Sequence, residues 1–365
     1  MAAVSPTNRR RWWPAWIVGA ILLLVAPPSP ASADTVEDGQ WYVNFLALGD
    51  AQKITKGAGV IVGVLDTGVG RHPDLSGDVL NGADARIGGT DRDGRNDRDG
   101  HGTRMAGLIG GNGRVRGVAP EATILPVKVM TVGEAYGSIA EGINWAVDHG
   151  AKVLCIAIHA GEPALDDEAA IRRAIRSDVV VVAGAGNADG ADGVGYPAAY
   201  EGVVAAGGVD RNGHHADISV RGDKIVLSAP SDDISSTAPH GEYTLGTGTS
   251  DSTALIAGAA ALVRAKFPEL SAEEVIHRLT YTADDKGPAG RDDEYGYGVV
   301  NIVKALTADV PPLRPAAGTS PQAEGESAGD LSTGTVVAIV TAVLVAVALL
   351  AFLIILGRRN RARAT

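Results

Sequence analysis

Three polar side chains lie where a strand-like segment ends or a helix-like segment begins, and together they could perform nucleophilic catalysis. Asp66 follows the run VIVGVL, His101 lies in DGHGT, and Ser250 closes GTGTS. A serine hydroxyl is a weak nucleophile, so a base such as histidine must accept its proton, and a carboxylate must orient that base. These residue types therefore predict acyl transfer through a serine nucleophile.

A fourth side chain could stabilise the negative oxygen that forms in such a reaction. Asn187 ends the segment AGAGN, and a side-chain amide donor at an oxyanion contributes about 3 kcal/mol. Ser252 is a rival to Ser250 as the nucleophile. We favour Ser250 because Ser252 would lie inside the following helix, whereas unpaired N–H groups and the helix dipole favour negative charge at its first turn.

Strand-like and helix-like segments alternate from residue 60 onward. The expected strands are β-branched runs without polar alternation, typical of parallel strands buried on both faces, at 60–65, 124–130, 153–158, 179–183, 203–206 and 225–228. Helices are expected at 101–109, 138–149, 166–176, 251–266 and 271–280, the last with a Ser271–Glu274 capping box. This alternation predicts an α/β sandwich whose sites lie where strands end and helices begin.

The motifs DTGV, HGT, AGAGN and GTS, in this order, resemble those of the subtilisin-like serine proteases. The order Asp, His, Ser differs from that of chymotrypsin-like enzymes and of α/β-hydrolases. The resemblance extends over residues 60–305 and implies a three-layer α/β sandwich with a mainly parallel sheet that cleaves polypeptides, and we expect neither cofactor nor metal. It implies Asp66 as the orienting acid, His101 as the general base, Ser250 as the nucleophile and Asn187 as the oxyanion donor.

The chain departs from that family beside its catalytic motifs. Asp251 follows the serine where the family usually has an apolar residue, and Ala254 replaces the usual proline. A carboxylate close to His101 would raise the pKa of the imidazole. Arg104 follows HGT, and we hypothesise that it offsets Asp251 across the site, because both residues follow catalytic motifs on helices that must converge.

Two loops leave alternatives open. The segment expected to pair with substrate backbone reads AIHAG at 157–161, a change that backbone pairing tolerates. His159 in this segment either lines the cleft or is a loop histidine, and we favour the loop. Acids alternate at 91–97 as in part of a calcium loop, but the terminal Glu is missing, so we favour a solvated acidic loop.

The two ends of the chain predict export and membrane anchoring. Residues 1–33 carry three arginines, a short apolar run and the cleavage pattern Ala-Ser-Ala, typical of a signal peptide. A span needs ~20 apolar residues, so we favour cleavage over an uncleaved anchor. Residues 335–356 are uncharged and long enough to cross a bilayer, and the tail at 357–365 holds four arginines. The positive-inside rule places that tail in the cytoplasm and the preceding chain outside the cell membrane.

Three further segments lie between these ends. We expect a catalytic domain at 59–307 and a Pro-, Gly- and Ser-rich stalk at 308–334. A lead-in at 34–58 is expected to wrap the catalytic domain through Trp41, Tyr42, Phe45 and Leu46.

Charge and cysteine content exclude other classes. The net charge is −11, and the arginines of the two ends make the region between them more acidic still. Phosphate contacts dominate nucleic-acid binding, so this balance argues against a nucleic-acid partner. Cys155 is the only cysteine and lies in an apolar run, which predicts a buried thiol rather than a nucleophile.

The whole arrangement resembles the mycosins, actinobacterial subtilases associated with type VII secretion systems. The order of signal peptide, lead-in, subtilase domain, stalk and single span is similar, as is the sequence at 248–280. This resemblance implies a type VII membrane complex as partner. Two functions remain open: cleavage of an exported polypeptide, and a catalytically weak domain that stabilises a secretion complex.

Overall fold

The computed structural model describes residues 35–75, 79–86, 88–131, 138–189 and 193–313. Nearly all of them belong to Met1–Pro311, the first of two units into which the chain divides, the second being Pro312–Thr365. The predicted signal peptide, span and basic tail lie outside the described residues, as does the stalk beyond residue 313. Within the described ranges, no helix combines the length and the apolar character that crossing a membrane requires.

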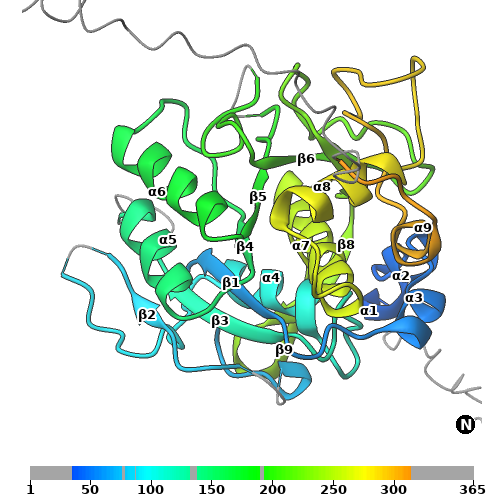
Figure 1. The fold of residues 1–365 in the computed structure, drawn as a ribbon. Helices are drawn as coiled ribbons and strands as arrows, with labels where there is room; N and C mark the ends of the chain where they lie inside the picture. Colours follow the sequence, from blue (N-terminus) through cyan, green and yellow to red (C-terminus); the bar gives the residue numbers. More distant parts are fainter. Residues whose placement is uncertain (1–34, 76–78, 87, 132–137, 190–192, 314–365) are drawn as a thin grey trace, which may run out of the picture. The chain divides into compact units, whose positions relative to one another are not determined.

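A parallel sheet forms the middle layer of the fold (Figure 1). Its strands among the described residues are β1 (Ile61–Asp66), β2 (Ala83–Asp84), β3 (Thr123–Lys128), β4 (Val153–Ile156), β5 (Val180–Gly184), β6 (Val204–Val209) and β7 (Leu227–Pro230). They lie in the order β2-β3-β1-β4-β5-β6-β7, and all neighbours are parallel. Successive residues of a strand enter different cores, as Val181 and Val182 do in β5. The prediction of strands buried on both faces is confirmed.

Helices cover both faces of the sheet and complete three layers (Figure 1). They are α4 (His101–Gly110), α5 (Ile139–Asp148), α6 (Leu165–Arg176), α7 (Thr249–Lys266), α8 (Ala272–Tyr281) and α9 (Ile302–Thr307). Helices α5 and α6 share one core with the sheet, whereas α4 and α7 share the other. The predicted three-layer α/β sandwich with a mainly parallel central sheet is confirmed.

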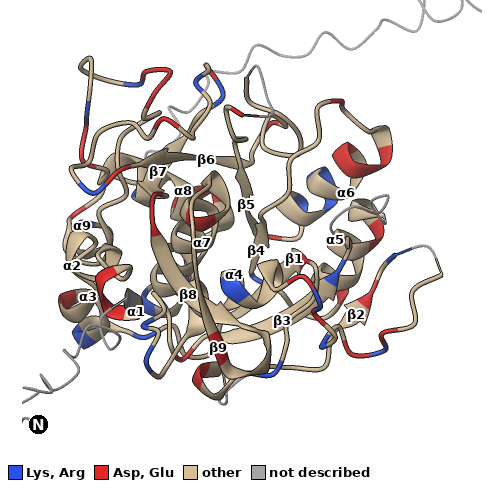
Figure 2. Ribbon diagram, turned by 180° about the vertical axis from the view of Figure 1, so that it is seen from behind, with Lys and Arg blue, Asp and Glu red and all other residues tan. Residues whose placement is uncertain are grey.

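Helix ends follow the local chemistry of the sequence. The hydroxyl of Ser271 accepts a 3.2 Å hydrogen bond from Glu274 N, and the Glu274 carboxylate accepts one of 2.9 Å from Ser271 N. The predicted capping box is therefore present at α8. In Figure 2 the ribbon of α6 is coloured for acidic residues in the first turn and for basic residues further along, the distribution that the helix dipole favours.

Helix α7 is buried on all sides, so it needs small side chains to approach its neighbours. A Cβ at Gly258, for example, would lie 2.6 Å from Cβ of Val118. The helix is continuous through Ala254, where the family usually has proline. The first turn of α7 is thereby held rigidly at the centre of the molecule.

Several elements were not predicted from the sequence. The lead-in forms the short helices α1 (Thr35–Asp38), α2 (Tyr42–Phe45) and α3 (Leu48–Ile54). Strands β8 (Ile234–Ala238) and β9 (Glu242–Gly246) form an antiparallel hairpin around the 3₁₀ turn Pro239–Gly241, and a second 3₁₀ turn spans Pro73–Leu75. The hairpin strands ISSTA and EYTLG lack the apolar β-branched runs that marked the other strands.

The lead-in helices are tied to the loop that follows α4. The fully buried Tyr42 donates a 3.0 Å hydrogen bond to Arg116 O. Gln40 donates to Arg114 O and accepts from Arg116 N, at 2.9 and 2.8 Å. The aromatic and apolar residues expected to pack on the main domain do so, since Tyr42 and Leu46 join its core and Trp41 and Phe45 pack against it.

Tyr42→Ala should lower the free energy of unfolding by about 3–5 kcal/mol, because it leaves a cavity in the core. Tyr42→Phe removes only the hydrogen bond and should lower it by about 1 kcal/mol. Urea unfolding of variants in a Ser250→Ala background would measure both effects without self-digestion. Tyr281→Ala, at a 56% exposed position, serves as the control. An unchanged stability of Tyr42→Ala would show that the lead-in unfolds separately.

Candidate active site

Asp66 and His101 meet where β1 ends and α4 begins. His101 Nδ1 lies 2.8 Å from Oδ1 and 2.9 Å from Oδ2 of Asp66. The Asp66 carboxylate is 1% exposed, and its Oδ1 also accepts a 2.7 Å hydrogen bond from Thr67 N. The His101 side chain is 30% exposed. The carboxylate therefore fixes the ring through Nδ1 and leaves Nε2 for a reacting group.

Asp97 joins the end of β1 to the first turn of α4. Its Oδ1 accepts hydrogen bonds from Thr67 Oγ1 (2.9 Å) and Gly100 N (2.8 Å), and its Oδ2 accepts from Thr103 N (2.9 Å) and Thr103 Oγ1 (2.6 Å). Thr67 Oγ1 in turn accepts from Gly102 N at 2.9 Å. Asp97 thus satisfies the helix N-terminus that presents His101.

The prediction of a solvated acidic loop at 91–97 is wrong for the last residue of that segment, because Asp97 is buried and only 5% exposed. Its position shortly before a predicted helix start was the signal for a capping role. The other acids of the loop bond to nearby backbone: Asp91 accepts from Asn96 N, and Asp93 from Arg95 N. In the described parts of the chain, no group of three or more His, Cys, Asp or Glu side chains could hold a metal ion.

Ser250 lies in the first turn of α7. Its hydroxyl donates a 3.4 Å hydrogen bond to Ala157 O, and no hydrogen bond among the described residues joins it to His101. Catalytic hydrogen bonds are often long before substrate binds and tighten afterwards. Ser252 is fully buried and donates at 2.9 Å to Ala229 O in β7, so it faces the sheet and not the cleft.

Ser250 and Asn187 share a pocket of about 140 Å³, which is also lined by Ala157, Ile158, His159, Gly184, Gly186, Asp189 and Thr249. Asn187 Oδ1 accepts hydrogen bonds from Thr249 N (3.0 Å) and Thr249 Oγ1 (3.1 Å). This orients the amide and leaves Nδ2 as a donor. A Cβ at Gly248 would lie 3.2 Å from Nδ2, so glycine keeps space around that donor.

His159 is part of the pocket lining, so our preference for a loop histidine over one that lines the cleft is wrong. The segment after β4 lies beside Gly195, because a Cβ added to Gly195 would lie 2.1 Å from His159 Nε2. Burial lowers the pKa of His159, which favours a neutral ring in the pocket. A larger cavity of about 590 Å³ lies elsewhere, against Arg71, Arg95 and His240; the chemistry of the lining, not its volume, identifies the site.

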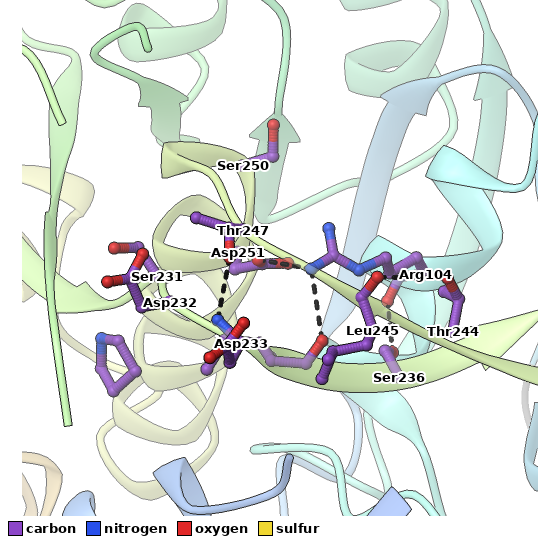
Figure 3. Close-up of polar contacts among 12 residues, drawn as sticks. Arg104, Ser231, Asp232, Asp233, Ser236, Thr244, Leu245, Thr247, Ser250 and Asp251 are labelled. Carbon is purple, nitrogen blue, oxygen red and sulfur yellow. Dashed lines mark hydrogen bonds and ion pairs between the residues drawn. The ribbon is translucent and has the colours of Figure 1, made fainter. Parts of the chain in front are cut away.

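The residues after the catalytic motifs form a buried ion pair (Figure 3). Arg104 Nη2 lies 2.6 Å from Asp251 Oδ2, with the Arg104 side chain 10% exposed and that of Asp251 fully buried. The Ser250 side chain points away from this pair in Figure 3. The expected convergence of Arg104 and Asp251 is confirmed by this contact, and the effect of the pair on catalysis stays a prediction.

Burial and charge act in opposite directions on the ionisable groups. Burial lowers the pKa of His101, but the charge and hydrogen bond of Asp66 outweigh it and raise the pKa overall, while Arg104 lowers it and Asp251 raises it. Burial raises the pKa of Asp251 to about 6 although Arg104 opposes the shift. Burial raises the pKa of Cys155 well above its ordinary value, so this thiol is the inert core residue that the sequence predicted.

Comparison with known proteins places this geometry in a family. The profile described as Subtilase family matches residues 57–298. Subtilisin DY from Bacillus licheniformis is 37% identical over 260 residues, covering 68% of this chain and 92% of its own. Subtilisin Savinase from Lederbergia lenta is 37% identical over 254 residues, covering 68% of this chain and 91% of its own.

Solved structures give the same answer. MycP1 from Mycobacterium smegmatis superimposes with a TM-score of 0.67 at 27% identity, covering 77% of this chain and 89% of that one. The MycP3 protease from the type VII (ESX-3) secretion system gives a TM-score of 0.63 at 31% identity, covering 74% and 88%. This chain belongs to the subtilase family, as a serine endopeptidase similar to the mycosins.

Proposed function

We propose that the chain is a membrane-anchored, extracytoplasmic endopeptidase that cleaves an exported polypeptide, with Asp66, His101, Ser250 and Asn187 as its catalytic residues. One observation carries the proposal. Ser250 and Asn187 share a pocket, while both carboxylate oxygens of Asp66 hold Nδ1 of His101. The nucleophile, the base, its orienting acid and an oxyanion donor are thus supplied by the ends of β1 and β5 and the first turns of α4 and α7.

The reaction follows from these positions. Ser250 Oγ attacks the carbonyl carbon of the scissile peptide bond while His101 Nε2 takes the hydroxyl proton. Asp66 stabilises the imidazolium that results, and Asn187 Nδ2 donates a hydrogen bond to the tetrahedral oxyanion. His101 then protonates the leaving amine, and a water molecule activated by the same base hydrolyses the acyl-enzyme.

The location and partner are supported by the sequence and by the neighbours. The basic and apolar segment at 1–33 and the uncharged stretch at 335–356, followed by four arginines, support export and a single membrane anchor. Similarity to a protease from a type VII secretion system supports an association with such a complex. The alternative is a weakly active domain that stabilises the complex. The negative charge of Asp251 beside Ser250 is an argument for this alternative, but the pairing of Asp251 with Arg104 weakens that argument.

A fluorophosphonate probe should label the wild-type protein and Ser252→Ala, but not Ser250→Ala. The secreted proteins of cells carrying wild type, Ser250→Ala or a deletion should then be compared by proteomics. We expect unprocessed polypeptides in both mutant strains. Loss of secretion only in the deletion strain, together with unlabelled but folded wild-type protein, would establish the stabilising role instead.

The activity should fall as the pH drops through the pKa of His101, because only the neutral imidazole accepts the serine proton. Asp66 raises this pKa, so Asp66→Asn should move the acid limb of the kcat/KM profile to lower pH. The same change should lower kcat by about 10⁴-fold, since the ring loses its orienting partner. An acid limb that stays in place in Asp66→Asn would contradict the role of Asp66.

Asp189 should give the pocket a modest preference for basic side chains. It is the one carboxylate, and no lysine or arginine is present, among the described residues that line the pocket. Exposed ion pairs contribute about 0.2–1 kcal/mol, so Asp189→Asn should lower the ratio of kcat/KM for lysine over glutamate substrates by up to about fivefold. Asp217→Asn, away from the lining, serves as the control, and an equal change there would refute a local effect.

A further inference from the structure

The helices that carry the proposed base and nucleophile come from distant parts of the chain and share one hydrophobic core. His101 and Ser250 form no hydrogen bond with each other in the described structure, so their own contact does not set their distance. The first turns of α4 and α7 are joined instead by Arg104 and Asp251, one turn after His101 and one residue after Ser250. These two residues are therefore placed to control the geometry of the reacting groups.

Besides its own helix and Asp251, the hairpin of β8 and β9 also holds Arg104 in place (Figure 3). Its carbonyl accepts a 2.7 Å hydrogen bond from Ser236 Oγ, and its Nη2 lies 3.4 Å from Ile234 O. In β9, a Cβ at Gly246 would lie 2.4 Å from Nη2, so the strand covers the guanidinium directly. The hairpin thus holds Arg104 in the conformation that reaches Asp251.

The pair is poorly suited to a purely stabilising role. Asp251 is fully buried, yet among the described residues its Oδ1 has no hydrogen-bond partner, and neither has the buried Nε of Arg104. A buried ion pair with unsatisfied atoms adds little net stability, because the cost of desolvation offsets the attraction between the charges. Losing one partner is nevertheless destabilising, because the other group is left buried without a partner. What this contact supplies is a directed link between two helices.

The two charges of the pair also have opposite effects on the pKa of His101, the proposed base. The charged groups that act on His101 are Asp66 from β1, Arg104 from its own helix and Asp251 from α7; the last two shift its pKa in opposite directions. The charge of Asp232 also raises the pKa of Asp251. Burial, and after it the charge of Asp251, raises the pKa of Tyr42 in the lead-in. Removing Asp251 would leave the positive charge of Arg104 unopposed near His101, whereas removing Arg104 would favour the protonated form of the buried Asp251.

We propose that Arg104 and Asp251 are a positioning pair: their contact sets the distance between His101 and Ser250 and keeps the two added charges from disturbing the base. The inference rests on the proposed catalytic roles of His101 and Ser250. Neither member of the pair contacts substrate in this proposal; both act through the helices that they join.

The test uses near-isosteric neutral variants of the full chain: Arg104→Met, Asp251→Asn and the double variant. Asp251→Asn leaves a positive charge and should move the acid limb of kcat/KM to lower pH by about half a pH unit or more. Arg104→Met leaves the buried Asp251 without its partner. Because burial raises the pKa of Asp251 to about 6 even against the charge of Arg104, this carboxyl should then take up a proton, and the acid limb should stay close to its wild-type pH. The double variant should return the limb to the wild-type pH. In all three, kcat should fall about tenfold or more with little change in KM, because the link is lost.

A purely structural role would not move the acid limb in Asp251→Asn while leaving it in place in Arg104→Met and in the double variant. Limbs that stay in place in both single variants, or a double variant with wild-type kcat, would overturn the proposal. Arg221→Met is the matched control, because it removes an arginine from an exposed ion pair with Glu294. If Arg104→Met does not fold, Arg104→Lys tests the same idea: the limb should stay while kcat falls, and an unchanged kcat would refute positioning.

A second readout separates this inference from the proposed function. NMR titration of His101 in a Ser250→Ala background measures its pKa without any activity. A pKa of His101 that falls in Asp251→Asn and returns to its wild-type value in the double variant would support the charge balance even if the wild-type protein proved inactive. Absence of such shifts in an active enzyme would refute the pair while leaving the proposed function intact.

Discussion

The buried carboxylate at the end of β1 is the constraint on which the rest of the site depends. Asp66 is almost inaccessible to water, and an ionised group in such a place must be compensated. His101 Nδ1 and Thr67 N supply that compensation, and Asp97 fixes the helix start from which His101 reaches Asp66. The carboxyl end of β1 therefore determines the position of His101.

The second constraint is the buried first turn of α7. A helix that runs through the core can present Ser250 rigidly, but only if its side chains are small. Asp251 interrupts this apolar surface with a charge, and burial works against its ionisation. Arg104 on the neighbouring helix forms an ion pair with Asp251. The departure from the family after the serine motif is thus compensated by the departure after the histidine motif.

Elements outside the central sandwich complete these arrangements. The hairpin of β8 and β9 covers Arg104, and the hydroxyls of Ser236 and Thr237 bond to the backbone of α4. The lead-in in turn reaches the hairpin, since Ser235 N donates a 2.9 Å hydrogen bond to Gly39 O. The two segments that look least like regular structure in the sequence thus support the helix that carries His101.

The sequence by itself determined the parallel sandwich and the positions of Asp66, His101, Asn187 and Ser250, because these follow from local signals: apolar runs, helix starts and the rule that sites form where strands end. Even the pairing of Arg104 with Asp251 followed, once both helices were known to converge. Tertiary structure alone decided that Asp97 is buried, that His159 lines the pocket and that β8 and β9 form a hairpin. Those features depend on which segments come together in space, and the local pattern of residues carries little information about such contacts.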